Sequence, residues 1–300
     1  MVTIFAISKP IVWLLMKFYG LSPQIIETEP ETQIKMCVPS KTKSRNKPNV
    51  VFLHGFAADG IFSWMSQVVA ISSTYAVYVP DLLFFGGSFT DKPGRSTTFQ
   101  AEVVVAALRK VGVKKCTVVG LSYGAAVGFK MAKLDPELVE FVVASDTIIE
   151  LNVLEKYGFD SFVDFLLPST VEGLMKFLTI ANHGPVNMPL FVAKDFLREF
   201  FTNRKEIVEL AEAWVTLDNE VNSISLSQVC YFDEFHLVWG DDDKVFNSTV
   251  AEKTKMQLGG DTTLHYIEDE GHTIQMEKLD LYNTELKRIL TSFYTKTKEC

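Results

Sequence analysis

Short apolar runs alternate with stretches of helical periodicity along most of the chain. Six runs are uninterrupted and rich in β-branched residues, which is typical of strands buried on both faces of a sheet. The expected strands are 49–54, 75–81, 116–122, 139–145, 235–240 and 263–268. The intervening helical patterns cover 62–71, 100–111, 125–134, 250–257 and 279–294. This alternation predicts an α/β fold, with a mostly parallel central sheet and helices on both faces.

The alternation stops between residues 146 and 234, where no strand is predicted. The segment has helix-like parts separated by Pro168, Pro185 and Pro189. Its phenylalanines are Phe159, Phe162, Phe165, Phe177, Phe191, Phe196, Phe200 and Phe201. We interpret residues 146–234 as a helical insertion into a core made of 23–145 and 235–300, preceded by an N-terminal helix in 1–22. Most of these rings are expected to pack inside the insertion, and some to face a ligand.

The N-terminal segment has an apolar helical face. This face consists of Ile11, Leu14, Leu15 and Phe18. The run is too short to cross a membrane, which needs about 20 apolar residues, and no small-residue cleavage site follows it. We expect a helix that packs on the domain. The alternative is weak contact with a membrane surface, since Lys9 and Lys17 flank the run.

Composition narrows the classes of function. The chain has 300 residues and a formal net charge of −8, which argues against a nucleic-acid partner because phosphate binding needs clustered Lys and Arg. The basic run 41–47 lies among Ser, Asn and Pro residues and is expected to be a solvated loop. The four cysteines are Cys37, Cys116, Cys230 and Cys300. Their wide spacing predicts no metal site. It fits a reducing compartment, so we expect a cytoplasmic protein, either free or peripheral to membranes.

The sequence Gly120-Leu121-Ser122-Tyr123-Gly124 stands where a strand pattern changes into a helix pattern. A sharp strand-to-helix turn would present the Ser122 hydroxyl clear of the sheet, and the two glycines would leave room for that turn. The helix N-terminus behind Ser122 would direct backbone N–H groups towards a developing oxyanion. We therefore take Ser122 as the candidate nucleophile.

A serine nucleophile needs a base and a group that orients the base. His272 follows the last expected strand in the sequence Glu-Asp-Glu-Gly-His and is the candidate base. Asp241, Asp242 and Asp243 follow the preceding strand, and Asp146 follows the one before it. One of Asp241, Asp242 and Asp243 could orient the imidazole, and the order Ser, Asp, His along the chain is the order that this kind of turn uses.

The loop after residues 49–54 should supply the second oxyanion donor. It reads His54-Gly55-Phe56, where the glycine allows close approach of the backbone.

Together these pieces resemble the α/β-hydrolase fold, and within it a plant branch similar to monoacylglycerol lipases and small carboxylesterases. The matching segments are VVFLHGF, YVPDLLFFGGS, VVGLSYGAAVG, LVWGDDDKVF and EDEGHTIQMEK. The resemblance implies Ser122, Asp243 and His272 as the catalytic triad, the N–H groups of Phe56 and Tyr123 as the oxyanion hole, and the insertion as a cap. Relatives that open epoxides carry aspartate where this chain has Ser122, and some relatives place the acid of the triad at the position of Asp146.

By the same resemblance, His54 supports the oxyanion loop and does not transfer protons. Asp81, at the end of a strand, is expected to hold the next loop by hydrogen bonds. His183 is expected in a loop of the insertion, with contact to substrate as the alternative. The chain departs from the family pattern at Asn247, where proline is common.

We therefore expect an esterase or lipase that acts on a small lipophilic carboxylic ester, because the insertion offers many phenylalanines and no evident charged clamp. Two alternatives stay open. One is a small-molecule receptor on the same fold, and the other is acyl transfer or lyase chemistry by the same triad. No metal or organic cofactor is implied. The substrate and the choice between monomer and dimer are not readable from the pattern.

Overall fold

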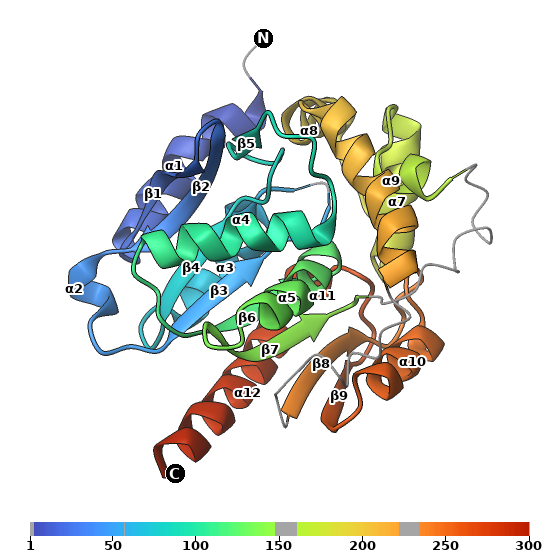
Figure 1. Cartoon of the computed structure of the whole chain (residues 1–300). Helices are drawn as coiled ribbons and strands as arrows, with labels where there is room; N and C mark the ends of the chain where they lie inside the picture. The colour runs from blue at the N-terminus through green and yellow to red at the C-terminus, as the bar shows by residue number, and fades with distance from the viewer. Residues whose placement is uncertain (1–2, 57, 148–160, 222–233, 300) are drawn as a thin grey trace.

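A nine-stranded mixed sheet forms the centre of the computed structural model, which describes residues 3–56, 58–147, 161–221 and 234–299 (Figure 1). The strand order is β1-β2-β4-β3-β6-β7-β8-β9, and the short β5 pairs with β2. The strands are β1 Leu21–Glu29, β2 Thr32–Pro39, β3 Asn49–Leu53, β4 Ala76–Pro80, β5 Phe89–Thr90, β6 Cys116–Leu121, β7 Val139–Ser145, β8 Glu234–Gly240 and β9 Asp261–Ile267. Strands β4, β3, β6, β7, β8 and β9 run parallel. Their carboxyl ends therefore meet at one edge of the sheet.

Helices cover both faces of the sheet, as the alternating pattern predicts. Apolar side chains of α4, α5 and α10 belong to one buried cluster, and those of α1, α3 and α12 belong to the other. The bounds are α1 Ile4–Phe18, α2 Lys41–Ser44, α3 Gly60–Ile71, α4 Thr97–Lys110, α5 Tyr123–Leu134, α10 Ser248–Leu258, α11 Ile274–Glu277 and α12 Leu279–Glu299. The α/β-hydrolase architecture expected from the sequence is confirmed.

Two parts of the N-terminal region differ from expectation. The first is the antiparallel hairpin of β1 and β2 at the end of the sheet, which had not been predicted. The second is the orientation of α1. The helix packs on the domain as expected, but it does so through Val12, Trp13 and Met16. Its predicted core face points to solvent, where Leu14 is 71% and Phe18 75% exposed.

Four described helices lie between β7 and β8, in the place of the expected insertion (Figure 1). They are α6 Phe162–Leu166, α7 Val171–Ala181, α8 Leu190–Phe200 and α9 Arg204–Val221. Polar contacts fasten this cap to the core. Asn203 Nδ2 donates to the carbonyl of Phe84 at 2.8 Å, and Arg95 Nε donates to Glu209 at 2.8 Å. Phe159 lies outside the described residues.

Candidate active site

Ser122 occupies the turn between β6 and α5, in a backbone conformation that side chains rarely adopt. Its φ is 51° and its ψ is −118°. The N–H of Ser122 donates to the carbonyl of Ser145 at 2.9 Å, and its carbonyl accepts from Thr147 Oγ1 at 2.8 Å. Strain of this kind persists only where surrounding contacts hold it. Here the end of β7 holds it.

The two glycines on either side of Ser122 are required by close approach of backbone. A Cβ on Gly120 would lie 2.5 Å from the Cα of Ala125, inside the first turn of α5. A Cβ on Gly124 would lie 2.3 Å from the carbonyl oxygen of Leu53, at the end of β3. The glycine pattern therefore lets α5 begin directly over the ends of β6 and β3, which is the turn expected from the sequence.

His272 and Asp243 come together at the ends of β9 and β8. Nδ1 of His272 lies 2.9 Å from Oδ2 of Asp243. The other carboxylate oxygen of Asp243 accepts from the N–H groups of Val245 at 2.7 Å and Phe246 at 2.9 Å. Asp243 is 3% and His272 7% exposed. A carboxylate held in this way fixes the ring orientation and places the proton of the neutral imidazole on Nδ1, which leaves Nε2 as the basic atom.

The other three aspartates have different partners. Asp241 is exposed, and Oδ2 of Asp242 contacts His183 Nδ1 at 2.8 Å and Lys244 Nζ at 3.0 Å. Asp146 is fully buried, and its Oδ1 accepts from the N–H of Gly240 at 3.0 Å. Among these four carboxylates, the hydrogen bond to His272 in the described structure comes from Asp243.

Asp146 nevertheless interacts electrostatically with Asp243, the partner of His272. Burial raises its pKa well above the usual range, and the nearby carboxylate of Asp243 raises it further. Its Oδ2 is buried without a hydrogen-bond partner. These surroundings favour the neutral form of the Asp146 carboxyl. The sequence could not separate these roles, because the two residues differ only in what surrounds them.

The loop after β3 lies against the Ser122 turn. A Cβ on Gly55 would be 3.5 Å from the Cβ of Ser122. His54 is fully buried, and burial lowers its pKa to about 4. Its Nδ1 contacts the carbonyl of Gly55 at 2.7 Å, and its Nε2 accepts from the N–H of Leu82 at 2.9 Å. With both nitrogens bonded to backbone, the neutral His54 ring joins this loop to the loop after β4.

Asp81 makes a similar connection from the end of β4. Its Oδ1 accepts from the N–H of Gly60, the first residue of α3, at 2.9 Å. Its backbone carbonyl accepts from Ser88 Oγ at 2.6 Å. Burial raises the pKa of Asp81 to about 6, while Lys35, 3.1 Å from Oδ2, opposes that rise. Asp81 therefore ties α3 to the loop after β4.

Aromatic rings border the candidate oxyanion donors. The ring of Phe56 lies 4.5 Å from that of Tyr123 and stacks on Trp214 of α9, with centroids 5.7 Å apart and planes at 8°. Trp214 also contacts Tyr123 at 5.0 Å and Phe162 at 5.6 Å. The N–H of Tyr123 opens α5, where the partial positive charge of the helix gathers. Trp214 had not been singled out, although its helical spacing from Ile207 predicts an inward position.

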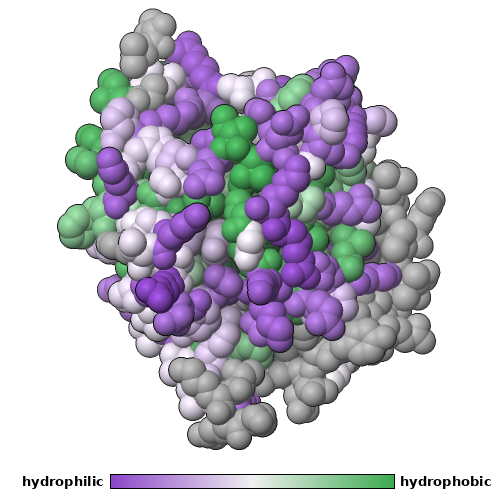
Figure 2. All heavy atoms as spheres, turned by 60° about the vertical axis from the view of Figure 1, so that its left-hand side comes forward, coloured by the Kyte–Doolittle hydropathy of each residue, from purple (hydrophilic) through white to green (hydrophobic). Residues whose placement is uncertain are grey.

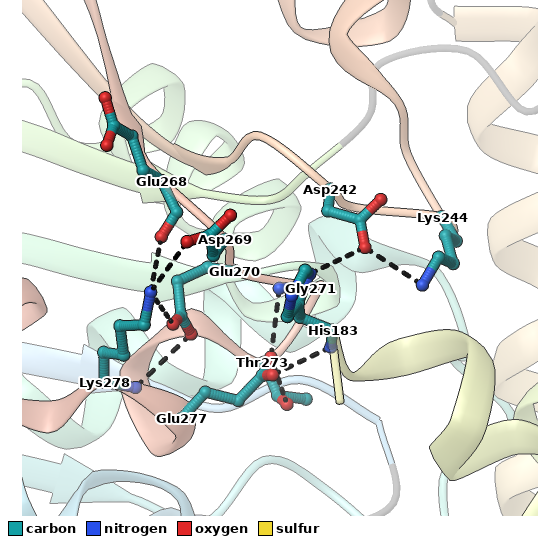
Figure 3. Close-up of polar contacts among 10 residues, drawn as sticks. All are labelled: His183, Asp242, Lys244, Glu268, Asp269, Glu270, Gly271, Thr273, Glu277 and Lys278. Atoms are coloured by element: carbon teal, nitrogen blue, oxygen red, sulfur yellow. Dashed lines mark hydrogen bonds and ion pairs between the residues drawn. The ribbon is translucent and has the colours of Figure 1, made fainter. Parts of the chain in front are cut away.

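The end of α7 holds the loop that carries His272. The carbonyl of Ala181 accepts from the N–H of His272 at 2.8 Å. As Figure 3 shows, the Glu277 carboxylate reaches both sides of this junction, because it accepts from the N–H groups of Gly271 at 3.1 Å and His183 at 2.8 Å. His183 thus lies in a loop of the cap, as expected. Glu277 is a positioning residue that the sequence did not single out.

No group of three metal-ligating side chains occurs within the described ranges. Nor does any helix in the described part of the chain have the length and apolar character needed to cross a bilayer. Asn247, the departure from the family pattern, directly precedes α10, and its Oδ1 accepts from the N–H of Thr249 at 3.1 Å. The side chain thus satisfies one of the N–H groups that have no partner within the helix.

Residues 48–279 match the family described as alpha/beta hydrolase fold. Epoxide hydrolase 4 of Mus musculus is 23% identical over 272 residues, which cover 80% of this chain and 72% of that protein. Monoacylglycerol lipase abhd6-B of Xenopus laevis is 23% identical over 258 residues, covering 81% and 75%. The crystal structure of a bacterial membrane phospholipase A superimposes with a TM-score of 0.76 at 20% identity, over 96% of this chain and 90% of that one. Relatives also occur in Homo sapiens, Haemophilus influenzae and Siraitia grosvenorii, so a plant branch is not supported.

Proposed function

Because this chain belongs to the α/β-hydrolase fold family, we propose that it is a serine hydrolase that cleaves lipophilic carboxylic esters. The observation that carries the proposal is the 2.9 Å contact between His272 Nδ1 and Asp243 Oδ2. It lies at the sheet edge where the strained turn presents Ser122. A base with a free Nε2, an orienting carboxylate and a presented hydroxyl are the groups that acyl transfer to serine requires.

In the first step of the proposed reaction, Ser122 Oγ attacks the ester carbonyl carbon while its proton passes to His272 Nε2. The π electrons of the carbonyl move to oxygen, and the N–H groups of Phe56 and Tyr123 stabilise that charge. Asp243 stays ionised and stabilises the imidazolium. The carbonyl then re-forms, the bond to the leaving oxygen breaks, and His272 returns its proton to the departing alcohol.

Water completes the cycle. His272 Nε2 takes a proton from a water molecule as its oxygen attacks the acyl carbon on Ser122. A second oxyanion forms in the same place and collapses. The bond to Ser122 Oγ breaks, the serine regains the proton from His272, and the carboxylic acid leaves. The enzyme is then in its starting state.

The relatives include both epoxide hydrolases and lipases, so the choice of ester needs its own argument. Epoxide opening by the aspartate of related enzymes uses a nucleophile that is already ionised. Ser122 has a neutral hydroxyl and becomes a strong nucleophile only when His272 removes its proton. That chemistry fits attack on a carbonyl whose developing oxyanion the N–H groups of Phe56 and Tyr123 would stabilise.

We propose a lipophilic substrate because aromatic side chains surround the turn that carries Ser122. Phe56, Tyr123, Trp214 and Phe162 form a connected group of rings that joins the core to the cap. Aromatic surfaces of this kind favour acyl or alkyl groups over charged ones. The ester proposed is therefore one with an apolar chain.

The proposal is tested with a fluorophosphonate probe, which phosphonylates an activated serine. We expect one adduct, on Ser122, that disappears in His272→Ala and persists in Ser248→Ala, a control in an exposed serine. Hydrolysis of p-nitrophenyl esters of increasing chain length should fall at least about 10³-fold in Ser122→Ala. Undiminished turnover in that variant would contradict the mechanism. A folded protein with neither adduct nor turnover would favour the receptor alternative.

A further inference from the structure

The N-terminal helix presents large apolar side chains to solvent along its whole length. We call these residues the apolar face: Ile4, Ile7, Ile11, Leu14, Leu15 and Phe18. Their exposed fractions run from 38% at Leu15 to 75% at Phe18. Figure 2 turns the side of α1 and β1 forward and shows apolar surface exposed among hydrophilic residues. A soluble monomer rarely leaves so large a continuous apolar surface without a function.

The cap adds to this surface. Ile4 N donates to Asp195 Oδ2 of α8 at 2.9 Å, which sets the start of α1 against that helix. Leu190 and Phe191, in the first turn of α8, are 59% and 60% exposed. Phe191 lies one helical turn before Asp195, so it extends the apolar face from α1 onto the cap.

A cluster of positive charge lies at the other end of α1, in a chain whose net charge is −8. The N–H of Ser40 donates to the carbonyl of Gly20 at 2.7 Å, which brings the start of the basic run 41–47 to the end of α1. Lys17, Lys41 and Arg45 are exposed there. Among the described carboxylates, none lies within ion-pair distance of these three side chains.

The inner side of α1 faces a cavity of about 400 Å³. Phe5, Val12 and Trp13 of the helix line it together with Ile61 and Phe62, and charged side chains, among them Lys9, Lys35, Asp81 and Glu199, line it too. Cavities of this volume accommodate small ligands. Ser122, Asp243 and His272 do not line it, so the cavity belongs to the surroundings of α1.

We propose that α1 and the start of α8 lie in the interface of an anionic lipid bilayer. An apolar strip on a helix too short to span, with cations beside it, is the arrangement that holds a helix in the plane of a membrane surface. The apolar face enters the acyl boundary, while Lys17, Lys41 and Arg45 contact the phosphates. The basic cluster favours an anionic bilayer over a second copy of this chain, because a second copy would bring its own basic cluster against the first. The surface would thus place the cap next to a source of lipophilic esters.

The experiment measures flotation of the full chain with vesicles of phosphatidylcholine alone and of phosphatidylcholine with phosphatidylserine in equal parts. We expect stronger binding to the anionic vesicles, weakened by salt. Lys17→Glu should lower that binding about 30-fold, because one basic residue near such a surface contributes about 1 kcal/mol and reversal of its charge counts twice. Lys253→Glu, on α10, is the matched control and should have no effect.

The apolar face is tested by Leu14→Ser combined with Ile11→Ser, against Met256→Ser, a control that is 71% exposed on α10. The double variant should bind both kinds of vesicle at least about 10-fold more weakly, with turnover of a short-chain ester unchanged as a check of folding. Wild-type protein that binds neither vesicle would overturn the proposal. So would a double variant that binds as wild type does, or a wild-type dimer that this variant dissociates, since a second copy would then cover the face.

Discussion

Asp146 is predicted to destabilise the protein at neutral pH, and Asp146→Asn to remove that cost. The carboxyl is fully buried, one oxygen has no hydrogen-bond partner, and Asp243 lies near it. Its pKa in the folded protein therefore lies well above the ordinary value of 3.8. Between those two values the folded chain keeps a proton that the unfolded chain has lost, so the free energy of unfolding falls as pH rises.

The size of this effect follows from the proton count. One proton held only by the folded state lowers the free energy of unfolding by about 1.4 kcal/mol for each pH unit. The loss begins near pH 4, above the ordinary carboxyl value, and continues up to the raised pKa of Asp146. An asparagine can still accept the hydrogen bond from the N–H of Gly240 through its amide oxygen and has no proton to lose. The stability difference between variant and wild type should therefore grow by about 1.4 kcal/mol per pH unit over this window.

Urea unfolding of both proteins at about pH 5, 6 and 7 measures that difference directly. A difference that does not change with pH would refute the reasoning, because Asp146 would then be ionised in the fold. Ester turnover should stay within about 10-fold of wild type in Asp146→Asn and fall about 10⁴-fold in Asp243→Asn. The reverse order would make Asp146 the orienting acid.

Further variants test the glycine turn, the aromatic wall and the cap junction. Gly124→Ala should lower the free energy of unfolding by about 3 kcal/mol or more, because its Cβ would lie 2.3 Å from a carbonyl oxygen of β3. The control Gly184→Ala has open space around the added Cβ and should leave the melting temperature unchanged. Trp214→Ala should raise KM about 10-fold for long-chain esters and little for acetyl esters, since a stacked ring contributes about 1 kcal/mol beyond its buried area; equal effects on both esters would contradict this. Glu277→Ala should lower kcat with less change in KM and cost about 1–3 kcal/mol, because the N–H groups of Gly271 and His183 lose their acceptors. Activity should recover only in part in Glu277→Gln, because the amide keeps one of the two accepting oxygens.

Much of the core could be read from the sequence because its strands are buried on both faces. The expected runs 49–54 and 116–122 agree closely with Asn49–Leu53 and Cys116–Leu121. The β1–β2 hairpin was missed for the opposite reason. Strand β1 is at the end of the sheet, with polar residues and a proline in its sequence, and its burial pattern lacks regular alternation. Strand β2 does carry an alternating signal in Ile34, Met36 and Val38, which could have been found.

For the candidate site, the sequence indicated residue types better than it did geometry. It placed Ser122 and His272 at the ends of their strands, because apolar runs stop there. It did not determine which aspartate meets His272, since that depends on the turn in which Val245 and Phe246 donate to Asp243. The apolar face of α1 shows the same limit. Helical periodicity identifies such a face, but does not say whether protein or solvent lies against it.

The attachment of the cap has a consequence for how this protein would select its ligand. The cap is joined to the core at Ala181, Asn203 and Glu209, and the first of these joins it to the loop of His272. If the cap moved away from the core at α7, its hydrogen bond to the backbone of His272 would pull the imidazole away from Asp243. These contacts favour a cap that stays in place, in which case discrimination among ligands would rest on how well each fits beneath it rather than on how fast the cap opens. Substitutions at positions such as Trp214 would then change which ligands bind, while the rate at which a ligand enters the site would stay the same.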